Sequence, residues 1–185
     1  GLVVDGSIFD TDGFKNVVAS EQGVIDNEAF VKFYNINTKV DYTPNPGANI
    51  FFRVGYFSED RGNGKITEVN DTVWRSLSGG VRLHLGGSDL QASLFLDKSD
   101  FHSNFVAVPA TTPPRNTVRL TLDQNVPTDG LGGMAQWSKS IGSSHFLTVG
   151  GDWRHVDGDS NEDAYNQQGP LVSPITAAVL ALQRV

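Results

Sequence analysis

Apolar and polar residues alternate with a period of two over most of this chain, a spacing that places successive side chains on opposite faces of a β-strand. The segment 88–97 is the clearest, because Leu90, Ala92, Leu94 and Leu96 alternate with mostly polar neighbours. The pattern recurs in 33–42, 49–57, 81–85 and 147–154, and more weakly in 2–9 and 133–141. We therefore predict an all-β chain of about seven strands, each of roughly ten residues.

The connections between these segments are alternately short and long. Tight turns rich in proline, glycine and serine lie at 44–47, 86–88 and 142–144. Long polar connections lie at 12–28, 58–71, 102–130 and from 157 onward. Connections this long are uncommon in compact domains, whereas membrane β-barrels combine short periplasmic turns with long extracellular loops. We expect an antiparallel meander with its long loops at one end and its short turns at the other.

Composition excludes several classes of function. The net charge of -7 at pH 7 argues against nucleic acid as a partner, because phosphate binding requires a basic face. The chain has no cysteine, which rules out disulfides and thiolate metal sites. No apolar run reaches the roughly 18–20 residues of a membrane helix. The four histidines show no metal-ligand spacing and no catalytic motif is present, so we expect neither an enzyme nor a resident cofactor.

Two folds are compatible with the alternation. In a soluble β-sandwich the apolar faces pack against a second sheet, whereas in a membrane barrel they face lipid and the polar faces line a wet lumen. Charges of both signs in mid-strand favour the barrel, with these residues on its concave, luminal face: Lys39, Asp41, Arg53, Arg82, Asp97, Asp152 and Arg154. The convex face would then carry Ile50, Phe52, Leu83, Leu94 and Val149.

A third arrangement is a complete small barrel of about eight strands. It would require residues 171–185 to form the last strand. Pro170 and Pro174 make that segment a poor strand, because proline cannot donate to the hydrogen-bond ladder. We therefore favour a barrel sector over a complete barrel.

Two short motifs carry a family resemblance. Residues 54–64 read Val-Gly-Tyr-Phe-Ser-Glu-Asp-Arg-Gly-Asn-Gly, and residues 69–72 read Val-Asn-Asp-Thr. A strand that runs into such a loop, followed by a strand that returns through Asn-Asp-Thr, resembles the barrel portion of TonB-dependent outer-membrane receptors. The strand and turn pattern of most of the chain is similar to that family.

The resemblance implies a sector of a transmembrane β-barrel in the bacterial outer membrane, with the lipid bilayer as a partner. Such a receptor binds a large ligand, either a metal chelate such as a siderophore or an oligosaccharide, and admits it by energy-coupled transport. The energy comes from an inner-membrane complex that acts through a plug domain. Residues 1–185 lack the plug and most of the family's strands, so we expect one β-barrel segment from inside a longer receptor.

The resemblance also implies where ligand contacts lie, because lumen-facing residues and loops capture the ligand in this family. The luminal candidates are Arg53, Arg82 and Arg154. The candidates in or directly before the longest connection are Phe101, Phe105 and Arg115. The identity of the ligand is left open at this stage.

An acidic segment near residue 160 raises the question of a calcium site. Asp157, Asp159, Asn161 and Asp163 present oxygen ligands at alternate positions. An EF-hand is excluded, because Glu162 occupies the position that needs glycine and Gln168 the position that needs a bidentate glutamate. The remaining interpretations are a looser calcium site in an extracellular loop and an acidic solvated loop, and the second is favoured.

The alternative function is a soluble, secreted β-sandwich that binds carbohydrate. Its stacking platforms would be Trp74, Trp137 and Trp153. The two hypotheses differ at Leu90, Ala92, Leu94 and Leu96. A sandwich buries these side chains against a second sheet, whereas a barrel sector leaves them accessible on its outer face.

Overall fold

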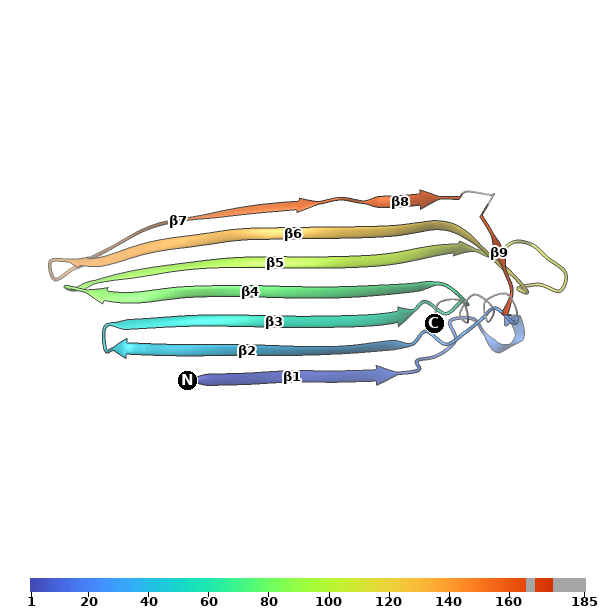
Figure 1. The fold of residues 1–185 in the computed structure, drawn as a ribbon, viewed down its shortest axis with the longest axis horizontal. Helices are drawn as coiled ribbons and strands as arrows, with labels where there is room; N and C mark the ends of the chain where they lie inside the picture. Colours follow the sequence, from blue (N-terminus) through green and yellow to red (C-terminus); the bar gives the residue numbers. More distant parts are fainter. Residues whose placement is uncertain (166–168, 175–185) are drawn as a thin grey trace.

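A single antiparallel sheet dominates the computed structural model, which describes residues 1–165 and 169–174 (Figure 1). Its main strands follow one another in sequence order, so the predicted meander is confirmed. They are β1 (Leu2–Thr11), β2 (Val31–Asn45), β3 (Ala48–Gly62), β4 (Val69–Leu85), β5 (Ser88–Ala107), β6 (Val118–Ile141) and β7 (His145–Gly158). Two short strands, β8 (Asn161–Ala164) and β9 (Leu171–Val172), pair with the first part of β6.

Short turns and long connections lie at opposite ends of the sheet, as the sequence predicts (Figure 1). The tight turns follow β2, β4 and β6, and the longer connections follow β1, β3 and β5. Gly86 and Gly87 have φ values of 56° and 80°, which a two-residue hairpin turn requires and which side chains disfavour. We call the two ends of the sheet the turn end and the loop end.

β1 has the predicted ten residues, but β2 to β7 are longer. β5 has 20 residues and β6 has 24, and much of the predicted loops 58–71 and 102–130 is paired strand. Polar residues occupy both faces in these extensions, for example Glu59 to Arg61 on β3 and His102 to Asn104 on β5. The alternation of apolar and polar residues therefore stops there, although the backbone ladder continues.

The sheet stays open within the described residues, since β1 pairs only with β2 and β7 pairs only with β6. The predicted last strand of a complete small barrel is reduced there to β9, and residues 175–185 lie outside the described part of the chain. The short helix η1 (Ala19–Glu21) is a 3-10 turn. Among the described residues, no helix is long and apolar enough to cross a membrane.

The buried apolar residues lie at the loop end rather than between layers of the sheet. Among the described residues they are Ile25, Ile66, Val118 and Val172, and Val106 and Val108 pack against them. We call these four buried residues the loop-end cluster. They join the connection 12–30, the connection 63–68, the start of β6 and β9, so the long connections are packed on one another.

Candidate functional site

The two faces of the sheet follow from the strand register, because residues directly opposite one another share a face. One register row contains Leu2, Val40, Phe52, Gly79, Leu94, Gly133 and Trp153. The face that carries this row is called the apolar face, and it also carries Ile50, Leu83 and Val149. The predicted partition of apolar residues onto one side of the sheet is therefore confirmed.

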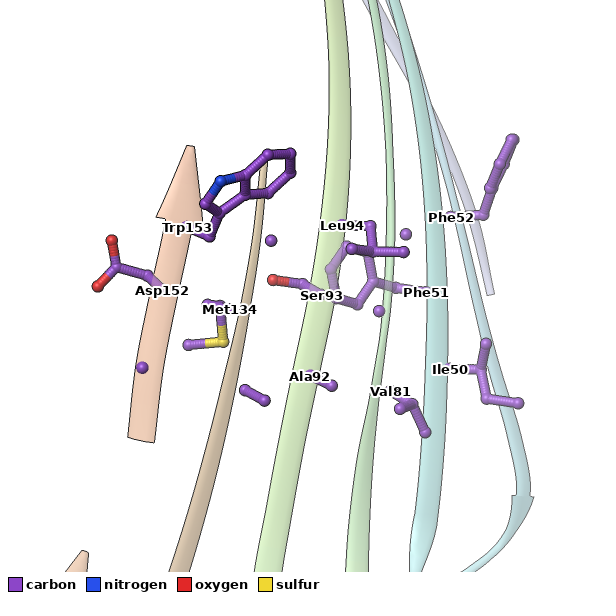
Figure 2. A pocket seen from close by; sticks show the side chains of 15 residues that line it. Ile50, Phe51, Phe52, Val81, Ala92, Ser93, Leu94, Met134, Asp152 and Trp153 are labelled. Carbon is purple, nitrogen blue, oxygen red and sulfur yellow. The ribbon is translucent and has the colours of Figure 1, made fainter. Parts of the chain in front are cut away.

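The apolar face is accessible along its whole width. Leu94 in its centre is 66% exposed, and Phe52 and Trp153 are 48% and 56% exposed. A shallow hollow of about 890 Å³ lies against β3 to β7, where Gly79, Ala92 and Gly133 leave little side-chain volume (Figure 2). The second sheet that a β-sandwich requires over this face is not found in residues 1–165 and 169–174.

The limits of the apolar face cross the register rows at an angle. On β1 its last apolar residue toward the loop end is Ile8, followed on the same face by Asp10. On β7 it is Trp153, which lies in the row of Leu2. From Ile8 to Leu2 is six residues along β1, and β1 to β7 is six strand steps, so the limit moves on average one residue per strand. With about 3.3 Å per residue and 4.8 Å between strands, the limit is inclined by about 35° to the perpendicular of the strands. If the limit is taken as level, the strands tilt by the same angle.

The tight turns are displaced in the same direction and by the same amount. Ala48 follows the first turn and pairs with Leu83, while the second turn begins two residues farther, after Leu85. Ser88 follows that turn and pairs with Lys139, while the third begins two residues farther, after Ile141. Each turn thus lies two residues beyond the previous one over two strands. Figure 1 shows each successive turn farther out at the turn end.

The opposite face, called the polar face, carries the charged residues predicted for a lumen. Lys39 lies opposite Arg53, and Asp152 and Arg154 follow on β7. Asp152 and Trp153 are neighbours on β7 and lie on opposite sides of the strand (Figure 2). Lys39 pairs with Asp41 at 2.8 Å, and Arg82 donates to Gln91 at 3.5 Å.

The predicted ligand residues are divided between the strands and the loop end. Arg53, Arg82 and Arg154 share the polar face, and Phe101 and Phe105 follow its alternation on β5. Arg115 lies apart from them, in the connection between β5 and β6. The structure therefore does not bring these six residues into one site.

Arg115 is held in an ion pair with Asp26, which is 3% exposed. Its Nε donates to Asp26 Oδ2 at 2.7 Å, and the N–H of Gly23 donates to the same oxygen at 2.8 Å. The hydrogen bond from Arg115 lowers the pKa of Asp26 and outweighs the opposing effect of burial. The pair joins two long connections beside the loop-end cluster.

The candidate calcium ligands do not share one loop, since only Asp159 lies between β7 and β8. Asp157 belongs to β7, and Asn161 and Asp163 belong to β8, where they pair with Asn125 and Asp123. Alternate residues of an extended strand are about 7 Å apart, too far for several of them to reach one cation at 2.3–2.6 Å. The described residues contain no group of three or more side chains placed to hold a metal ion.

His102 has no partner at metal-ligand spacing in the sequence, but the structure places it between two carboxylates. Its Nδ1 lies 2.7 Å from Asp71 on β4, and its Nε2 lies 2.7 Å from Asp123 on β6. Partial burial lowers the pKa of His102, but the two hydrogen-bonded carboxylates outweigh burial and raise it overall. The sequence pattern predicts a loop from His102 onward, so it does not predict that this residue aligns with Asp71 and Asp123 across the strands.

A second feature missed from the sequence is a run of aromatic residues on the polar face. Phe9 and Phe33 stack at 5.4 Å between ring centroids, and Phe33 and Phe57 follow at 5.9 Å. Trp74 lies opposite Phe57 in the register. The three tryptophans do not share a face, because Trp137 and Trp153 lie on the apolar face.

Comparison with known proteins gives no relative from which to transfer a function. No protein-family model, no curated protein and no solved structure matches this chain.

Proposed function

We propose that this chain is a sector of an outer-membrane β-barrel receptor of the TonB-dependent type. Its apolar face contacts the lipid bilayer, its polar face lines the lumen, and its loop end faces the outside of the cell. The receptor binds a large ligand and admits it by energy-coupled transport. The motifs at 54–64 and 69–72 support the receptor type, and the geometry supports the membrane barrel.

The observation that carries this proposal is the common tilt of the apolar limits and the turns. In a membrane, the apolar band is level while the strands of a barrel tilt by about 35–45°, so the band must shift along successive strands. The shift of one residue per strand corresponds to about 35°. A face that merely packs on another sheet has no such requirement.

The height of the apolar face agrees with this interpretation. On β2 it extends from Tyr34 to Tyr42, and on β4 from Leu77 to Leu85. Eight residues span about 27 Å along a strand, or roughly 22 Å after a tilt of 35°. Outer-membrane barrels have an apolar band about 25 Å tall, so these strands are long enough to cross it.

In this proposal the chain belongs to a transport protein rather than an enzyme. The ligand is bound by lumen and loop residues, and energy reaches the barrel from an inner-membrane complex through a plug domain outside residues 1–185. The open edges of β1 and β7 support a larger barrel. Unpaired backbone groups are costly in lipid, and further strands would pair them.

A pair of neighbouring substitutions tests the lipid-facing assignment. Leu94→Arg places a charge in the centre of the apolar face, where arginine costs about 2–4 kcal/mol at the bilayer midplane. Ser93→Arg places the same charge on the polar face, one residue away in β5. We expect Leu94→Arg to reduce the amount of heat-modifiable receptor in the outer-membrane fraction well below that of Ser93→Arg.

Equal tolerance of the two substitutions would contradict a lipid-facing Leu94. The comparison is controlled internally, since both variants introduce the same side chain into the same strand. The two positions differ by one residue along the strand, so a difference in assembly shows the effect of the face that carries the arginine.

A further inference from the structure

We propose that the polar face binds a neutral oligosaccharide at a site centred on Trp74. This inference rests on the proposed function and adds the chemical class of the ligand. The site is a hollow of about 430 Å³ on the part of the polar face toward the loop end. It is lined by Asn35 and Asn37 from β2, by Gly55, Tyr56 and Phe57 from β3, and by Trp74 and Ser76 from β4.

Aromatic rings form one side of this hollow. Trp74 is 49% exposed and lies opposite Phe57, and the run continues through Phe33 to Phe9 on β1. A sugar ring has a face of C–H groups that packs well on a flat aromatic surface. Phe101 lies opposite Thr72, so it is a diagonal neighbour of Trp74 on the same face of β5. Several rings in a row match a ligand made of several sugar units.

Amides and hydroxyls form the other side. Asn37 donates to Asn35 Oδ1 at 3.5 Å, and Asn35 donates to Ser7 Oγ at 2.5 Å. Each asparagine amide has two N–H donors and an accepting oxygen, so donors remain on both residues after these contacts. An amide that both donates and accepts suits the hydroxyl groups at the edge of a sugar ring.

Gly55 keeps the floor of the hollow open. A Cβ atom there would lie 2.5 Å from Ser76 Oγ and 2.9 Å from Asn37 Oδ1, so a side chain would displace both polar groups. The two polar side chains therefore converge over the backbone of β3, beside the aromatic rings. This mixture of flat apolar surface and a few fixed polar groups is typical of small-molecule sites.

The lack of charged side chains around the hollow favours a neutral oligosaccharide over an anionic metal chelate. No charged side chain lines this hollow among the described residues. An anionic metal chelate would be stabilised by cations, but the neighbouring cations on this face, Lys39 and Arg53, do not line the hollow, and Lys39 pairs with Asp41. A neutral, hydroxylated ligand needs no cation in its site.

The experiment measures the binding of defined probes to the intact receptor in outer-membrane vesicles. Maltohexaose and cellohexaose represent neutral oligosaccharides, and ferric citrate represents an anionic metal chelate. We expect at least one hexasaccharide to bind, with Trp74→Ala weakening its Kd at least tenfold and Trp74→Phe much less. Trp153→Ala removes a similarly exposed tryptophan on the apolar face and should change Kd less than twofold.

Asn37→Ser provides a second variant in case Trp74→Ala does not assemble, and it too should weaken the binding of the hexasaccharide. Binding of ferric citrate without either sugar, binding of no probe, or an equal loss with Trp153→Ala would overturn the inference. Failure of the proposed function is separate, because it would appear as absence of the receptor from the outer-membrane fraction before any probe is added.

Discussion

At the scale of single residues, His102 shows how a strand register creates a contact that the sequence does not display. Its partners Asp71 and Asp123 lie 31 and 21 residues away along the chain. A neutral imidazole can donate from only one nitrogen, whereas the protonated ring donates from both. Both contacts at 2.7 Å are therefore made by donation only when His102 carries its charge. The residue lies six positions beyond Leu96, outside the apolar face.

This arrangement predicts a pH-dependent contribution to stability. The pKa of His102 is raised in the folded protein, so its stabilising effect is complete below the ordinary histidine pKa of about 6.5. The effect is lost as the pH rises through the higher folded value. We expect His102→Gln to lower the unfolding temperature more at about pH 5.5 than at about pH 8.5. His84→Gln is the control, because the exposed ring of His84 contacts one carboxylate, that of Asp89, among the described residues.

Thermal unfolding of both variants across this range provides the measurement. A destabilisation by His102→Gln that is independent of pH would contradict the charged bridge. It would leave His102 as a neutral hydrogen-bonding residue.

At the scale of elements, the loop end is a small folded unit attached to the sheet. Its connections exchange backbone hydrogen bonds, including Ile66 N–H to the Ile25 carbonyl at 2.9 Å and Asn27 N–H to the Gly64 carbonyl at 3.1 Å. The loop-end cluster and the Asp26–Arg115 pair lie beside these bonds. The long connections are therefore ordered by one another, which the polar composition of 12–28 and 102–130 does not reveal.

Removal of Arg115 tests how much of this unit depends on its ion pair. Arg115→Ala leaves the buried carboxylate of Asp26 without its cation, and breaking a buried pair in this way costs about 3–5 kcal/mol. We expect faster amide exchange at Ile25 and Ile66 and faster proteolysis within 12–30, with the exchange of β3 to β5 unchanged. Arg61→Ala, which removes the partly exposed pair with Glu59, should have an effect below about 1 kcal/mol.

Lowering the pH should weaken the same ion pair between Asp26 and Arg115. Because the pKa of Asp26 is lowered, the pair stabilises the folded form above the ordinary carboxylate range and loses this effect as the pH falls. Exchange rates in Arg115→Ala that match the unsubstituted protein would show that packing alone holds the connections together.

At the scale of the whole molecule, the described residues form one sheet with no second sheet over its apolar face, so this face must be covered from outside them. Lipid satisfies it in the proposed function. The three tryptophans then report the two environments, because Trp137 and Trp153 lie on the apolar face and Trp74 on the polar face.

Fluorescence quenching by brominated lipids measures this directly. Variants that retain one tryptophan each, with phenylalanine at the other two positions, separate the signals. We expect brominated acyl chains to quench Trp137 and Trp153 strongly and Trp74 weakly. Acrylamide in the water phase should show the reverse order. Equal quenching of all three by lipid would contradict a sheet with one lipid-facing side.

The sequence by itself determined the features that depend on near neighbours. The period of two assigned Leu94 and Ser93 to opposite faces, and turn residues such as Gly86 and Gly87 placed the hairpins, so the meander and its two ends were predictable. Tertiary structure alone decided the strand ends, the tilt, the bridge at His102, the aromatic run through Trp74 and the Asp26–Arg115 pair. Each of these depends on which residues face one another across strands or loops. That alignment is fixed by pairing along the whole sheet, and no local pattern encodes it.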